Sequence, residues 1–201
     1  MAYRPELELV FDSSSFEAGA NAASTKEPRT NTRIDLWYIG QSEKANMSMP
    51  SVERDFFLDN IRDHARGLVQ YETSIKSLLE TVSTSWQKAV RLHQQIRTLN
   101  IEYPTVIERK SDNSIVVITT MLLKSIATKL RLEFEMTAVS GSTFEIFVRN
   151  NVHVVYGSGF NKEKLMEFLD KRIKADAHGK GWMEILMELG EKLSIRGGGG
   201  K

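Results

Sequence analysis

The chain has 201 residues, a formal net charge of +1 and a hydrophobic fraction of 41%, enough for a core in one or two domains. No apolar run reaches the ~18 residues of a transmembrane helix, and the acidic, proline-containing start is unlike a signal peptide. The lack of cysteine excludes disulfides, thiolate metal sites and cysteine nucleophiles. We therefore expect an intracellular protein, cytosolic or nuclear, without a membrane partner.

Charge is spread evenly along the sequence. Residues 1–50 carry five basic against seven acidic side chains (net −2), residues 51–100 seven against six (net +1), and residues 101–201 fifteen against thirteen (net +2). Proteins that bind nucleic acid electrostatically present strongly basic surfaces. No direct nucleic-acid partner is therefore expected.

The first block of the chain predicts two strands. Apolar and more polar side chains alternate from Tyr3 to Phe11, and residues 33–39 form a second alternating segment. Between them, residues 13–32 are polar and without periodicity, which indicates a disordered insertion. Two strands are too few for a stable sheet. Residues 1–60 are therefore expected to be a partial first unit, completed by upstream chain or by a partner.

The middle of the chain predicts one long amphipathic helix, residues 51–100, joining the first unit to a second. This stretch has no proline and one glycine, Gly67, and its apolar residues recur at steps of three and four, with misses at Glu72 and His93. Unbroken, it would span about 70 Å, which suits a scaffold better than a small enzyme. The apolar positions are Leu58, Ile61, Ala65, Leu68, Ile75, Leu79, Val82, Trp86, Ala89 and Ile96.

Residues 101–196 predict a complete second unit. Its alternation is clearest from Leu130 to Met136, and the order of strands followed by helices indicates an α+β fold with helices on one sheet face. Residues 197–201 are expected to be a flexible glycine tail. The predicted strands are 105–109, 114–123, 129–136, 144–148 and 152–156, and the predicted helices are 161–174 and 182–193.

A glycine pair offers one candidate for anion chemistry. Gly157 and Gly159 lie where a strand passes into a helix, but Lys162 stands where the dinucleotide fingerprint needs a third glycine. With Lys164, this helix start could attract an anion. A nucleotide- or anion-binding enzyme built on Gly157–Lys164 therefore stays an alternative to a simple tight turn.

Other reactive groups have simpler interpretations. The four histidines, His64, His93, His153 and His178, lack metal-ligand spacing. Glu133 and Glu135 share one face of a strand, which is typical of a solvated sheet face. The sequence therefore predicts no catalytic residue, no metal ligand and no cofactor site.

Four aromatic residues are the candidate partner-binding residues. Trp37, Tyr38, Phe56 and Phe57 fall in the incomplete first unit, where an open strand edge suits addition of a peptide strand. The alternative is that the long helix buries all four.

The ordered segments resemble the C-terminal region of the outer-kinetochore scaffold Blinkin in its fungal form, of the kinetochore-null family. The resemblance implies a pair of RWD domains, each an antiparallel sheet with flanking helices. The RWD fold is similar to ubiquitin-conjugating enzymes, whose chemistry needs a cysteine that this chain lacks. The segments are Leu7–Asp12, Ser15–Phe16, Ile34–Gly40, Phe56–His64, Val154–Gly157, Phe160–Asn161 and Glu191–Leu193.

The resemblance further implies a function. We expect a non-enzymatic scaffold module in the nucleus, at the kinetochore of the centromere, that docks onto a peptide or tail of the Mis-twelve complex. An upstream coiled coil is expected as a further partner. A purely structural coiled-coil dimer, held by the long helix, is the remaining alternative.

Overall fold

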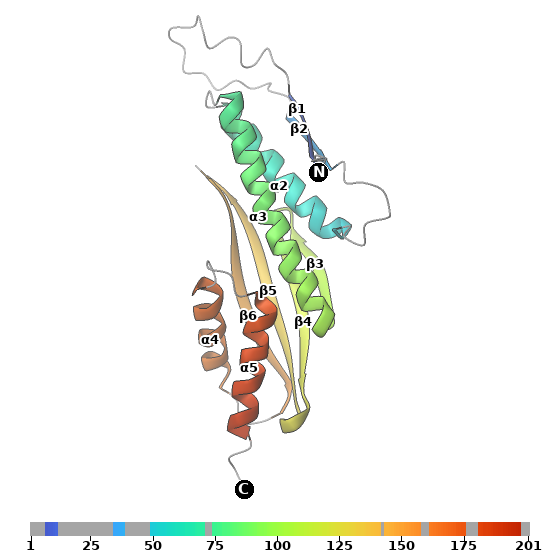
Figure 1. Ribbon diagram of the computed structural model, residues 1–201, viewed down its shortest axis with the longest axis vertical. Helices are drawn as coiled ribbons and strands as arrows, with labels where there is room; N and C mark the ends of the chain where they lie inside the picture. Colours follow the sequence, from blue (N-terminus) through green and yellow to red (C-terminus); the bar gives the residue numbers. More distant parts are fainter. Residues whose placement is uncertain are drawn as a thin grey trace, which may run out of the picture. The chain divides into compact units, whose positions relative to one another are not determined.

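The computed structural model of the chain describes residues 7–11, 34–38, 49–70, 74–141, 143–157, 161–175 and 181–197 (Figure 1). β1 and β2 form a two-stranded sheet, and β3 to β6 form a four-stranded sheet in sequence order. These antiparallel sheets with flanking helices confirm the predicted α+β class. The elements are β1 (Leu7–Phe11), β2 (Ile34–Tyr38), α2 (Ser51–Gln70), α3 (Ile75–Glu102), β3 (Thr105–Ser111), β4 (Ser114–Leu123), η2 (Lys124–Ile126), β5 (Thr128–Ser140), β6 (Phe144–Tyr156), α4 (Lys162–Ala175) and α5 (Trp182–Gly197).

The described part of the chain forms two compact units. The first contains the described residues up to Val90 together with Ala138–Glu145, and the second contains Arg91–Thr137 and the described residues from Ile146 onward. α3, β5 and β6 therefore contribute residues to both units. The predicted insertion at 13–32 and all but the first residue of the predicted tail lie outside the described residues.

The prediction of one continuous helix over residues 51–100 is wrong, because the structure has two helices there, α2 and α3. Ser74 caps α3, since its Oγ accepts a hydrogen bond from the backbone N–H of Ser77 at 3.2 Å. Because α3 begins at its own cap, its buried face does not have to continue the apolar stripe of α2. Leu78 is accordingly buried, whereas Leu79, a position in the predicted stripe, is 49% exposed.

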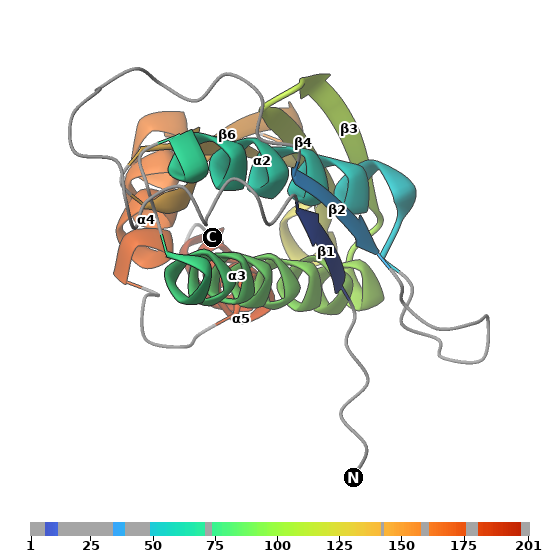
Figure 2. The same cartoon turned by 90° about the horizontal axis from the view of Figure 1, so that it is seen from above.

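In the first unit, α2 and the first half of α3 run alongside each other in opposite directions (Figures 1 and 2). β2 lies on the α2 side of the two-stranded sheet, and β1 lies on its other side (Figure 2). An apolar stripe buried within one chain weighs against a long two-chain coiled coil. The buried apolar residues of this unit include Ile34, Leu36, Phe56, Phe57, Leu58, Ile61, Ala65, Leu78, Val82, Trp86 and Ala89.

Strand alternation decides which face of the four-stranded sheet is buried. The antiparallel register sets Val117 of β4 opposite Phe134 of β5, and both are buried. α4 and α5 lie on this face of the sheet (Figure 1), and the ring of Trp182 stacks on that of Phe134 with 4.8 Å between centroids. The helices thus cover one sheet face, as predicted.

The prediction of two strands, 144–148 and 152–156, is wrong because the structure has one strand, β6, across both. Asn150 in its middle is buried, and its Nδ2 donates a hydrogen bond to Oδ1 of Asp170 in α4 at 2.6 Å. A partner on α4 therefore satisfies the Nδ2 group of a buried strand residue, while the Oδ1 of Asn150 is buried without a hydrogen-bond partner.

Candidate partner-binding surface

The structure separates the four predicted partner-binding aromatics. Adjacent residues of a strand point to opposite faces, so Trp37 and Tyr38 do not share a surface. Tyr38 turns inward, with its ring 5.8 Å from that of Trp86 in α3, while Trp37 is 58% exposed. Phe56 and Phe57, 5.2 Å apart in α2, are fully buried. Their assignment as partner-contacting residues is therefore corrected to core residues.

The edge of β2 that faces α2 is occupied by two arginine side chains. Arg62 Nη2 donates a hydrogen bond to the carbonyl oxygen of Leu36 at 3.0 Å, and Arg66 Nε donates to that of Ile34 at 3.1 Å. The spacing of two residues four apart along a helix is thus similar to the spacing of two carbonyl groups that are two residues apart along a strand. The expectation of an open edge is therefore wrong here, since a peptide strand would have to displace both guanidinium groups.

The outer face of the two-stranded sheet is the candidate surface. The register sets Glu8 opposite Trp37 and Val10 opposite Asp35, so these four side chains share one face; we call it the Trp37 face. Val10 is 45% exposed and lies diagonal to Trp37, a spacing of about 7–8 Å that an aromatic side chain can bridge. Asp35 already pairs with Arg66, whose Nη2 lies 3.5 Å from its Oδ1, so Glu8 is the carboxylate of this face that favours a basic group on an apolar partner segment.

Sequence reasoning found Trp37 but missed its neighbours. The alternation of the first strand already set Val10 and Glu8 on the more polar face, which was the available signal. The sequence could not predict that Arg62 and Arg66 bond to the edge of β2, because tertiary packing brings α2 beside this strand.

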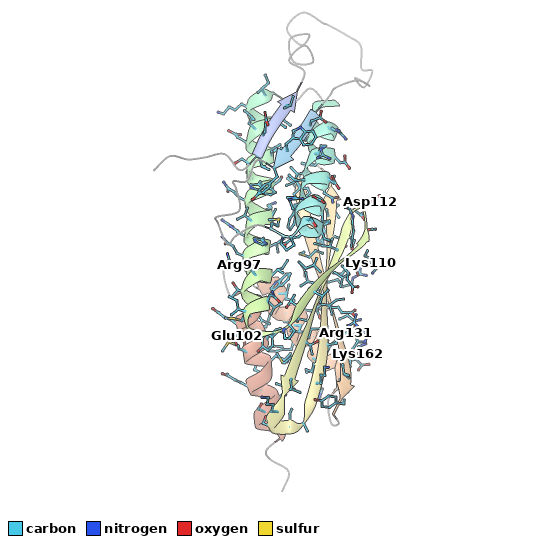
Figure 3. The ribbon with its side chains drawn as sticks, turned by 90° about the vertical axis from the view of Figure 1, so that its right-hand side faces the viewer. Arg97, Glu102, Lys110, Asp112, Arg131 and Lys162 are labelled. Carbon is cyan, nitrogen blue, oxygen red and sulfur yellow. The ribbon has the colours of Figure 1, made fainter. Side chains whose placement is uncertain are left out.

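Glu133 and Glu135 form ion pairs on the uncovered face of the four-stranded sheet. Lys110 Nζ donates to Glu135 Oε1 at 2.7 Å, and Arg131 Nε donates to Glu133 Oε1 at 3.0 Å; Lys110 and Arg131 project on the side opposite α3 (Figure 3). The hydrogen bond from Lys110 holds the pKa of Glu135 below its usual value. A carboxyl group that acts as a general acid at neutral pH needs a raised pKa. The carboxyl group of Glu135 is therefore suited to forming an ion pair and not to donating a proton.

The turn at Gly157 has a structural reason for its glycine. The backbone φ there is +111°, and a Cβ would lie 2.3 Å from Oγ1 of Thr128. Asn161 caps α4, its Oδ1 accepting the backbone N–H of Lys164 at 3.0 Å. These contacts support the tight-turn interpretation, while residues 158–160 of the predicted anion site lie outside the described residues.

Neither a metal centre nor a membrane span is found in the described ranges. No group of three or more His, Asp or Glu side chains there could hold a metal ion. None of the helices in the described part combines the length and apolarity that crossing a membrane requires.

His64 is a buried titratable group in the first unit. Its ring lies 5.8 Å from that of Phe144, and its Nε2 is buried without a hydrogen-bond partner. Lys88 of α3 donates to the carbonyl oxygen of the same Phe144 at 2.9 Å. Burial, and then the positive charge of Lys88, lower the pKa of His64 from 6.5.

The lowered pKa predicts that the first unit loses stability in mild acid. Well above pH 6.5 the imidazole is neutral in both states, so it adds no pH dependence there. Below it the unfolded chain binds a proton that the folded chain does not, so stability falls as pH drops towards the folded pKa, by at most about 1.4 kcal/mol per pH unit. Urea unfolding of His64→Leu across this window should show a flatter profile than the parent.

The matched control is Ile61→Val, one turn away on α2. Isoleucine and valine are both uncharged, so this substitution should lower the stability equally at every pH. The slope of stability against pH should stay that of the parent chain. A parental slope in His64→Leu would contradict the assignment of the titration to this histidine.

The first part of the chain matches a family of known proteins. Residues 1–93 match the family model described as the Knl1 RWD C-terminal domain. This stretch contains β1, β2, α2 and the larger part of α3, and with them every residue of the Trp37 face. No curated protein and no solved structure matches the sequence.

Proposed function

We propose that the chain is a non-enzymatic docking module for a subunit of the Mis-twelve complex, because residues 1–93 match a family of kinetochore protein-interaction domains, the Knl1/Blinkin-type RWD region. It acts in the nucleus, at the kinetochore of the centromere, during chromosome segregation. Upstream coiled coil of the scaffold is proposed as a second partner.

The exposure of Trp37 is the observation that carries this proposal. A tryptophan 58% exposed beside Val10 on a sheet face is poorly accounted for by packing alone. Tryptophan is also one of the residue types enriched among binding hot spots. The guanidinium groups on the β2 edge disfavour strand addition at that edge. The proposed ligand is therefore a peptide or tail that sets an apolar side chain on Trp37 and a basic one near Glu8.

Replacement of Trp37 by alanine is expected to weaken binding to the reconstituted Mis-twelve complex by about 30-fold or more, the size of a 2 kcal/mol hot spot. Stability should change by less than about 0.5 kcal/mol, because the side chain is mostly exposed. Isothermal titration calorimetry gives the affinity, and thermal unfolding gives the stability.

Phe147→Ala is the matched control, an exposed aromatic (55%) on the four-stranded sheet. It should leave the affinity unchanged. Equal losses in both variants, or no loss in Trp37→Ala, would count against the Trp37 face as the docking surface.

A further inference from the structure

A shallow groove in the second unit lies between the C-terminal half of α3 and the start of α5. Its volume is about 240 Å³, and it is lined by Arg91, Gln94, Gln95, Thr98, Trp182 and Met183 among others. Pockets that enclose drug-sized ligands usually measure about 300–1,000 Å³. The groove is thus small for a cofactor and better suited to a few residues of another chain.

The α3 wall of the groove is polar and positive. Arg91 forms no ion pair with any residue in the described part of the chain, and α3 carries no acidic side chain from Arg91 to Ile101. The exposed side chain of Gln94 adds an amide that can both donate and accept, whereas the Oε1 of Gln95 is buried without a hydrogen-bond partner. The acidic residue in the first turn of α5, Glu184, does not line the groove. Among the described residues that line the groove, a carboxylate would therefore meet a cation and no acidic side chain.

The α5 wall is apolar and firmly held. Trp182 is buried and stacks on Phe134 from the sheet beneath, so it forms a rigid floor. Met183 lines the groove, and Met187, one turn further along α5, is 48% exposed. Methionine is flexible and polarizable, and it is frequent on surfaces that bind peptides.

We propose that this groove docks a short acidic and apolar segment of a partner protein. A carboxylate of the segment pairs with Arg91, the backbone amides of the segment bond to Gln94, and an apolar side chain packs on Met183 and Met187. The groove lies in the second unit and the Trp37 face in the first. The two surfaces can therefore be tested, and can fail, independently.

The test is a methyl NMR titration of the full chain, labelled with ¹³C at its eight methionine methyl groups. The probe is a capped heptapeptide with three glutamates and two leucines, compared with the same peptide carrying glutamines. The acidic peptide should shift the signals of Met183 and Met187 saturably, with a Kd of about 0.1–1 mM. The glutamine peptide should bind at least about tenfold more weakly, because it lacks the charge-assisted contact.

Two arginine variants make the test specific. Arg91→Gln should lose the preference for the acidic peptide. Arg97→Gln should keep it, because Arg97 projects from α3 away from the sheet and does not line the groove (Figure 3). Absence of saturable shifts, equal losses in both variants, or tighter binding of a single-stranded oligonucleotide at the same methyl groups would each overturn the proposal.

Discussion

Replacement of Phe134 by alanine is expected to lower the free energy of unfolding of the second unit by about 3–5 kcal/mol, the range for deleting a buried aromatic ring. Phe134 is fully buried in the middle of β5, opposite Val117. Its ring also stacks on Trp182 at 4.8 Å, with 15° between the ring planes. The substitution therefore leaves a cavity between the sheet and α5 and removes a stacking contact worth about 0.5–1.5 kcal/mol of that loss.

Urea unfolding followed by the fluorescence of Trp182, in a chain whose other two tryptophans are phenylalanine, measures this loss. Phe147→Ala is the control, because it removes the same ring from the exposed face of the same sheet. It should change stability by less than about 0.5 kcal/mol. Similar losses in both variants would contradict the assignment of the buried and exposed sheet faces.

Replacement of Phe57 by alanine is expected to destabilise the first unit by about 3–5 kcal/mol without a direct loss of partner affinity. The ring of Phe57 has no exposed surface and lies 5.2 Å from that of Phe56 in the core that α2 helps to build. A side chain without exposed surface cannot touch a partner in this conformation. Its effect on binding should come only through the fraction of chain that is folded.

The measurement pairs urea unfolding, followed by the fluorescence of Trp86, with calorimetric binding at a temperature where the variant stays folded. Trp37→Ala supplies the opposite pattern, with lost affinity and kept stability. A Phe57→Ala chain with parental stability and greatly reduced affinity would place this residue at the interface after all.

The strands of the second unit could be predicted because their signal is local. The alternation in β4 and β5 reflects one buried face and one solvent-exposed face of the sheet. The predicted limits 114–123 match β4. The break predicted in β6 failed for a reason outside the strand. Asn150 is tolerated there through its bond to Asp170, twenty residues away in sequence.

The division of the central helix was hidden by a coincidence of spacing. Leu68 and Ile75 are seven residues apart, so the heptad pattern appears to continue across residues 71–74. The miss at Glu72 and the capping serine at position 74 were the local signs of a new helix. Periodicity alone cannot separate two helices in register from one.

The partner surface was predicted by proximity in sequence, which does not equal proximity in space. Trp37 and Tyr38 are neighbours in the chain but point to opposite faces of β2. Phe56 and Phe57 lie on α2 and are fully buried. Only the strand register shows that Val10, and not the other aromatics, accompanies Trp37 on the outer face.

Fluorine NMR of the chain labelled with 5-fluorotryptophan, before and after addition of unlabelled Mis-twelve complex, tests most directly whether docking uses the Trp37 face. The chain has three tryptophans, of which Trp86 and Trp182 are buried and Trp37 is exposed. We expect the Trp37 signal alone to lose its sensitivity to solvent on binding. Binding that leaves Trp37 as accessible as in the free chain, or no association at micromolar concentrations in low salt, would contradict the account.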